Sequence, residues 1–155
     1  MEFKFKAIGV IHSCFTTKGE APIQGSFHPD ANGKVEVFAA FSEGLQDIEL
    51  FSNVILIYHF DRASEVHLVR RPFLDDTSHG IFATRHPCRP NGIGLSIVRL
   101  LRREGNLLMV SGIDVLDGTP LLDIKPYVPR FDSVPDASEG WFTGKGKREK
   151  PAGRE

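Results

Sequence analysis

The sequence predicts a mainly all-β chain, folded as a small β-barrel with a few short helical turns. Turn signals made of Gly, Pro, Asn and Asp recur at short intervals along the 155 residues. The segments between these turns are short and rich in Val, Ile, Leu and Phe, and they do not alternate with long helices. Because many short strands would leave many unpaired edges, we expect the sheet to close on itself.

Eight segments are expected to be strands, because apolar and β-branched residues dominate them or alternate with polar ones. They are residues 3–13, 34–41, 53–60, 65–70, 80–84, 93–103, 107–115 and 121–124. The third is almost entirely apolar, which suits a central strand that is buried on both faces. The sixth and seventh are joined by Glu104-Gly105-Asn106, which predicts a long hairpin.

The remaining segments are expected to be loops or short helical turns. Residues 14–33 form a long loop that ends in a strong Pro-Asp-Ala-Asn-Gly turn. Residues 43–51 carry apolar side chains at helical spacing, which predicts a short helix or 3₁₀ turn. We expect one barrel domain over residues 1–140. A flexible basic tail is expected over 141–155, where Gly, Lys, Arg and Glu prevail.

The composition limits the classes of function. With 19 basic and 20 acidic residues, the chain lacks the excess charge with which a protein coats nucleic acid, although a local basic patch is compatible with it. Its two cysteines, Cys14 and Cys88, stand outside any CxxC pattern, which excludes a zinc ribbon and fits a reducing cytosol. No metal-ligand spacing, signal peptide or membrane-spanning run is present, so we expect a soluble cytoplasmic protein without a metal.

The densest polar cluster covers residues 84–91. Two prolines stiffen this segment, which holds Arg85, His86, Arg89 and Asn91, and glycines follow it. Guanidinium groups suit bidentate recognition of phosphate or carboxylate, and glycines let the backbone approach a ligand closely. The alternative is a solvated turn with surface arginines.

A second polar cluster consists of Asp114, Asp117 and Asp123, which lie in otherwise apolar sequence around an Asp-Gly-Thr-Pro turn. Burying an unpaired carboxylate is costly, so each needs a partner or a ligand. A structural salt-bridge network explains the cluster about as well as a ligand site does. The basic residues available as partners are Arg85, Arg89 and Lys125.

Other patterns point to different chemistry. His12 and Cys14 would share one face of an extended strand, and a small hydrolase that uses Cys14 or Cys88 is one class of function to consider. His59 and Asp61 end the apolar strand, where one of them could face a pocket. The absence of GxGxxG and of strand–helix alternation excludes a Rossmann methyltransferase.

Several motifs occur together in a characteristic order. They are Ile8-Gly9-Val10-Ile11-His12-Ser13, Phe51-Ser52, residues 80–85, Arg89-Pro90-Asn91, residues 93–96, residues 111–120 and residues 123–127. In this order they resemble the TrmO/TsaA-like (YaeB-like) family of S-adenosylmethionine-dependent tRNA methyltransferases, and the resemblance runs from about residue 6 to about residue 136.

The resemblance implies a small β-barrel methyltransferase that is distinct from the Rossmann and knotted types. Its cofactor would be S-adenosylmethionine and its partner tRNA. The implied reaction methylates the exocyclic N6 of threonylcarbamoyladenosine at position 37, next to the anticodon. The family also implies a homodimer with the cofactor near the subunit interface. A non-catalytic module that binds S-adenosylmethionine or RNA is the alternative.

The same resemblance implies roles for individual residues. The cofactor pocket would be lined by Ser13, Cys14, Phe15, Asp61, Arg62, Arg85, Leu95, Asp117, Gly118, Thr119 and Pro120. Substrate contacts are expected from Arg89, Asn91 and Lys125. A group that removes the N6 proton would assist transfer. The candidates are Asp114, Asp117, Asp61 and His59.

The sequence also departs from the family pattern. Cys14 and Gly92 stand where proline is usual, Asn53 replaces the histidine of an "FSH" motif, and Asp61 occupies a position where histidine is expected. The loss of these histidines is what favours the non-catalytic alternative. Many bacterial members carry a further C-terminal domain, which we do not expect in this protein, so tRNA binding is expected to use the dimer and the basic tail.

Overall fold

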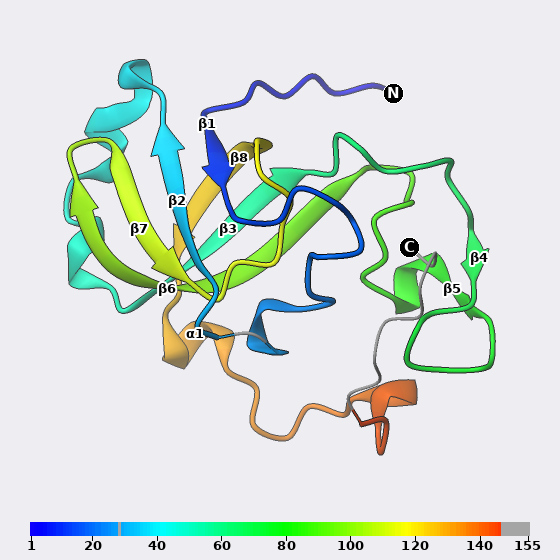
Figure 1. Cartoon of the computed structure of the whole chain (residues 1–155). Helices are drawn as coiled ribbons and strands as arrows, with labels where there is room; N and C mark the ends of the chain where they lie inside the picture. Colours follow the sequence, from blue (N-terminus) through cyan, green and yellow to red (C-terminus); the bar gives the residue numbers. More distant parts are fainter. Residues whose placement is uncertain (28, 147–155) are drawn as a thin grey trace.

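The computed structural model describes residues 1–27 and 29–146, and its centre is a closed antiparallel barrel (Figure 1). Around the barrel the strands follow the order β1-β2-β7-β6-β3-β8. Their bounds are β1 Gly9–His12, β2 Asn32–Val37, β3 Asn53–His59, β6 Ile93–Glu104, β7 Leu107–Ser111 and β8 Thr119–Pro126. The predicted all-β barrel is therefore confirmed, as is the hairpin of β6 and β7.

The core lies inside the barrel and follows the alternation of each strand. Along β6, buried and exposed residues alternate over most of the strand, so that one face points inward. The expectation that β3 is buried on both faces is wrong. Val54, Leu56 and Tyr58 are buried, whereas Ile55 and Ile57 are only half-buried. A closed barrel has a single interior, so each strand presents its other face outward.

Short helical turns connect and close the barrel. They are η1 Gly25–Phe27, η2 Ala39–Leu45, η3 Ile48–Leu50, η4 Ile81–Ala83, η5 Gly140–Phe142 and the α-helical turn α1 Pro129–Asp132. The helical turn predicted over residues 43–51 is confirmed as two 3₁₀ segments, η2 and η3. Leu45 and Ile48 from these segments are buried in the barrel core.

Several strands are shorter than their apolar patterns predict, among them β7, which ends at Ser111 and not at residue 115. The first begins at Gly9, because the preceding residues, 1–6, are exposed and have no ladder partner. β4 (Val69–Arg70) and β5 (His79–Gly80) pair only with each other, so each stops after two residues. The strand expected over residues 80–84 is mostly the 3₁₀ turn η4. Alternation alone cannot show whether a partner strand exists.

The chain between β3 and β6 leaves the barrel and carries the small β4–β5 sheet beside it (Figure 1). After α1 the chain returns to the same side, where η5 lies. Residues 147–155, most of the predicted tail, lie outside the described residues, and the domain boundary at residue 140 stays a prediction. None of the described helices is long and apolar enough to cross a membrane.

β1 closes the barrel, because it pairs with β2 on one side and with β8 on the other. Its first residue, Gly9, lies opposite Val37 and Leu121. A Cβ at position 9 would lie 2.0 Å from the carbonyl oxygen of Glu36. The strands can therefore meet at this point only if the residue is glycine.

We predict that Gly9→Ala lowers the free energy of unfolding by about 1–3 kcal/mol, because the backbone must shift to admit the methyl group. The matched control is Gly44→Ala in η2, where an added Cβ meets nothing within 4 Å. Urea unfolding monitored by circular dichroism measures both. Equal stability of Gly9→Ala and wild type would contradict the prediction.

Candidate functional site

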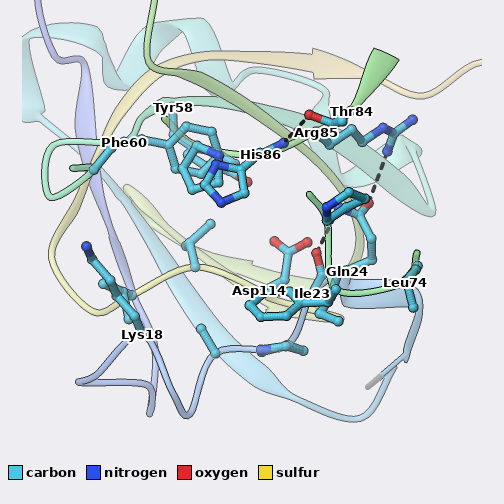
Figure 2. Close-up of a pocket in the computed structure, with 18 of the residues that line it drawn as sticks. Lys18, Ile23, Gln24, Tyr58, Phe60, Leu74, Thr84, Arg85, His86 and Asp114 are labelled. Carbon is cyan, nitrogen blue, oxygen red and sulfur yellow. Dashed lines mark hydrogen bonds between the residues drawn. The ribbon is translucent and has the colours of Figure 1, made fainter. Parts of the chain in front are cut away.

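A cavity of about 510 Å³ lies beside one end of the barrel (Figure 2). Its walls come from five parts of the chain: residues 18–24, the end of β3 at 58–63, the insertion at 72–74 and 84–87, the segment 114–119, and the C-terminal segment 139–142. This volume is within the range that holds a small organic ligand or cofactor. The cavity is therefore the candidate binding site.

A hydrogen-bonded chain of polar side chains forms one wall. The Ser96 hydroxyl bonds the Asp114 carboxylate, and the Tyr58 hydroxyl lies 3.0 Å from the Ser96 oxygen. Gly25 N–H donates to the second Asp114 oxygen at 2.8 Å. Because a carboxylate only accepts, Ser96 donates to Asp114 and Tyr58 donates to Ser96. In Figure 2 the Asp114 carboxylate points into the cavity, toward the side where Tyr58 and His86 lie.

Burial changes the acidity of this chain of groups. Desolvation raises the pKa of the Asp114 carboxyl above its ordinary value, while the hydrogen bonds from Ser96 and Gly25 oppose that rise. Desolvation, and then the charge of Asp114, raises the pKa of the Tyr58 phenol. Tyr58 therefore stays protonated as a donor, and Asp114 is a stronger base than an exposed aspartate.

Three cations stand in the cavity wall: Lys18, Arg62 and Arg85. Arg85 donates to the Gln24 side-chain oxygen at 3.0 Å (Figure 2). Arg62 donates to the Thr119 hydroxyl at 3.1 Å and pairs with Asp61 at 3.3 Å. These bonds hold the guanidinium groups in place, and their remaining N–H groups can bind an anion such as a carboxylate or phosphate.

The rest of the wall is largely apolar and aromatic. Phe60 meets Tyr58 edge to face, with ring centroids 5.3 Å apart. Space for the Tyr58 ring exists because its partner across the ladder is Gly94, where a Cβ would lie 2.1 Å from that ring. The glycines after residue 91 were expected to let a ligand approach the backbone closely. At Gly94 it is the Tyr58 ring that makes this close approach. Leu74 and Ile23 add further apolar surface.

Of the cofactor-pocket residues implied by the resemblance, the structure brings Asp61, Arg62, Arg85 and Thr119 to the cavity, together with Asp114. Others form a bonded pair of turns next to it. Ser13 N–H donates to Asp117 at 3.0 Å, and Asp117 N–H donates to the Phe15 carbonyl at 2.8 Å. The same turns include Cys14, Gly118 and Pro120.

The remaining predicted residues lie away from the cavity wall. Leu95 is on the outer barrel face and is 44% exposed. His59 is exposed, and its ring bonds the Gly92 carbonyl. Arg89 donates to the Thr84 carbonyl, Lys125 pairs with Asp123 at 2.7 Å, and Asn91 lies in the exposed turn before β6. Among the proton acceptors proposed, only Asp114 and Asp61 line the cavity.

The alternatives drawn from the sequence fare differently. Of the expected salt-bridge network, the pair Lys125–Asp123 forms, but Asp114 is bonded by Ser96 and Gly25 instead. Both ring nitrogens of His12 face carboxylates, those of Glu36 and Asp117, at 2.9 and 3.6 Å. The His12 ring therefore interacts with these carboxylates and not with the Cys14 thiol, as a Cys/His nucleophile pair would require. Within residues 1–27 and 29–146, no group of three or more His, Cys, Asp and Glu is placed to hold a metal.

Sequence reasoning missed Tyr58, Gln24 and Trp141 in the cavity wall, and it missed the buried Ser96, which bonds Asp114 and Tyr58 of that wall. The alternation along β6 could have revealed Ser96. This serine is the polar residue in an otherwise apolar series that faces inward, and a buried hydroxyl needs a hydrogen-bond partner. Gln24 and Trp141 come from loops that fold back onto the barrel, and no periodic pattern marks them.

These features define a class of protein: a small closed barrel whose cavity combines a half-buried, hydrogen-bonded carboxylate, guanidinium groups and aromatic side chains. Residues 10–133 match the family model described as the tRNA-methyltransferase O N-terminal domain. The chain belongs to this family. The resemblance seen in the sequence is thereby confirmed.

Individual relatives agree with this assignment. A probable S-adenosyl-L-methionine-binding protein of Pyrococcus abyssi is 55% identical over 138 residues, which are 89% of this chain and 75% of that protein. The tRNA (adenine(37)-N6)-methyltransferase of Escherichia coli is 36% identical over 149 residues, 90% of this chain and 63% of that protein. The crystal structure of TrmO from Pseudomonas aeruginosa superposes with a TM-score of 0.77 at 44% identity, covering 91% of this chain and 63% of that one. The chain thus spans less than two thirds of the last two proteins.

The raised pKa of Asp114 predicts how stability depends on pH. The folded protein holds this proton more tightly than the unfolded chain does, so stability attributable to Asp114 is present at low pH. It is lost as the pH rises from about 4 through the raised pKa. In Asp114→Asn this titration is absent. The difference in unfolding free energy, wild type minus variant, should therefore fall with rising pH. Urea unfolding at stepped pH measures it, and a pH-independent difference would rule the prediction out.

Proposed function

We propose that this protein is an S-adenosylmethionine-dependent methyltransferase that acts on the exocyclic N6 of adenine 37 in tRNA. More narrowly, we propose threonylcarbamoyladenosine as the acceptor. The observation that carries the proposal is the half-buried carboxylate of Asp114, which lines a cavity with guanidinium groups in its wall. The relatives from Escherichia coli and mouse, both named tRNA (adenine(37)-N6)-methyltransferase, support the reaction class.

The cavity fits the proposed cofactor by size and by charge. S-Adenosylmethionine carries a carboxylate, and a carboxylate suits the guanidinium groups of Arg85 and Arg62 in the cavity wall. Its ammonium and sulfonium groups are cationic, and Asp114 and Asp61 provide negative charge in the same wall. The neighbouring turns at residues 13–15 and 117–120 are proposed to complete the pocket.

The cofactor supplies an activated methyl group on a sulfonium, which becomes a neutral thioether when the methyl is transferred. The protein must hold this methyl and the adenine nitrogen at near-attack distance. An acylated N6 is a weak nucleophile, so a base that removes its proton assists the transfer. We propose Asp114 as that base. Ser96 donates a hydrogen bond to this carboxylate and Tyr58 donates one to Ser96, and together they keep the carboxylate oriented.

The proposal is tested with labelled S-adenosylmethionine and tRNA that carries the threonylcarbamoyl group. We expect label transfer to this tRNA, and a turnover about 100-fold or more lower for Asp114→Asn when it is measured at saturating cofactor. The matched control is Asp123→Asn, which removes a surface carboxylate paired with Lys125 and should keep wild-type turnover.

Three outcomes would each count against a part of this proposal. Cofactor binding without any label transfer would leave the non-catalytic binding module as the better description. Transfer to tRNA that lacks the threonylcarbamoyl group, at an equal rate, would refute the narrower substrate. Wild-type turnover in Asp114→Asn would remove Asp114 as the base while leaving the reaction class intact.

We further propose that the protein acts as a homodimer through the outer face of β3 and β6. Leu95 and Ile97 are 44% and 48% exposed there, and they lie opposite Ile57 and Ile55 in the ladder. A contiguous apolar strip of this kind is typical of an interface. A cofactor site completed across this face would account for Leu95 lying outside the cavity. Arg89, Asn91 and Lys125, also outside it, are proposed to contact tRNA.

We predict that Ile97→Asp converts the dimer to monomer, because an interface cannot bury an unpaired carboxylate without a large cost. The control is Leu50→Asp, an equally drastic change at an exposed position on η3. Sedimentation velocity at micromolar concentration distinguishes the species. A wild-type protein that sediments as a monomer would refute the dimer.

A further inference from the structure

The C-terminal segment beyond the matched family region forms part of the cavity. The family model ends at residue 133, yet Trp141 and Phe142 of η5 stand in the cavity wall. Figure 1 shows the chain after α1 running back to the side of the molecule that carries β4 and β5. We call residues 139–145 the C-terminal strap.

Trp141 and Phe142 of this strap form a stack of three rings with His79 of β5. The ring centroids of His79 and Trp141 are 4.4 Å apart with an interplanar angle of 10°, and those of Trp141 and Phe142 are 3.8 Å apart at 23°. Two rings that lie so close to one indole and nearly parallel to it would collide if they shared a face. His79 and Phe142 therefore cover opposite faces of Trp141, and Phe142 is the end of the stack.

Polar contacts hold the strap in this position. The Trp141 indole N–H donates to the Ala83 carbonyl at 2.8 Å. The Asp75 side chain, only 12% exposed, joins the two ends: His79 bonds one oxygen at 2.9 Å and Lys145 the other at 3.0 Å. The stack is thus fixed before a ligand arrives, which lowers the entropic cost of binding on it.

Phe142 is 37% exposed although it packs on Trp141 and lines the cavity. The indole covers one face of its ring, so the opposite face is the one left to meet a ligand. An uncovered phenyl face on a fixed support suits a flat ring, which would extend the stack by one member.

We propose that Phe142 is a stacking subsite for a purine ring. The choice of purine rests on the proposed function, in which both the cofactor and the acceptor carry an adenine. Phe142 would stack on the adenine in the same way whether that adenine belongs to the cofactor or to the acceptor. The strap thus contributes a ligand-binding residue that lies outside the matched family region.

The test compares three variants of the full chain. Phe142→Leu keeps apolar bulk but removes the flat ring, and Phe142→Tyr keeps the ring. Phe131→Leu is the matched control, because Phe131 is exposed and is absent from the cavity wall. Affinities are measured by calorimetry for two probes, S-adenosylmethionine and an anticodon stem-loop RNA with adenosine at position 37. Emission of the single tryptophan, Trp141, checks that the strap keeps its fold.

We expect Phe142→Leu to weaken one probe by roughly 5- to 100-fold, which is the effect of losing one base–aromatic stack. Phe142→Tyr and Phe131→Leu should bind as the wild type does. A loss confined to S-adenosylmethionine assigns the subsite to the cofactor, and a loss confined to the RNA assigns it to the acceptor. Both results support the subsite.

Other results overturn it. Unchanged affinity of Phe142→Leu for both probes refutes the subsite alone, since the wild type still binds. An equal loss in Phe142→Tyr shows that the flat ring is not what matters and refutes it as well. If the wild-type protein binds neither probe, both the subsite and the proposed function are refuted.

Discussion

Closure of the barrel by β1 is the constraint on which the site depends. This four-residue strand pairs with both β2 and β8, and the carbonyl of Glu36 leaves no room for a side chain at Gly9. Where β1 ends, Ser13 bonds Asp117 and the carbonyl of Val115, so the closing strand also anchors the segment that carries Asp114. A shift of β1 would therefore move the turn and one wall of the cavity together.

The interior of the barrel and the chemistry of the site share residues. Tyr58 belongs to the core cluster, and its hydroxyl also begins the hydrogen-bonded chain that reaches Asp114 through Ser96. Gly94 makes this arrangement possible because it admits the tyrosine ring. A carboxylate held in this way is partly desolvated yet fully hydrogen-bonded, a state that suits a base better than that of an exposed aspartate.

Segments distant in sequence complete the cavity around this wall. Arg85 comes from the insertion after β5, and Gln24, which orients it, comes from the loop after β1. The strap that carries Phe142 returns from beyond the barrel and is held by Asp75 of the insertion. Ligand affinity should thus depend on loops whose positions are set by a few polar contacts, whereas stability depends mainly on the barrel.

The alternation of apolar residues by itself determined the all-β class, the β6–β7 hairpin and the approximate place of most strands, because burial in a sheet has a period of two. The ordered motifs determined the family and marked Arg85, Arg62, Asp61 and Thr119. Only the tertiary structure decided that β3 has one buried face, that Asp114 rather than Asp117 lines the cavity, and that Leu95 faces outward. These depend on which strands pair, on barrel closure and on loops folding back, all of them contacts between residues far apart in the chain. Local sequence patterns do not predict such contacts.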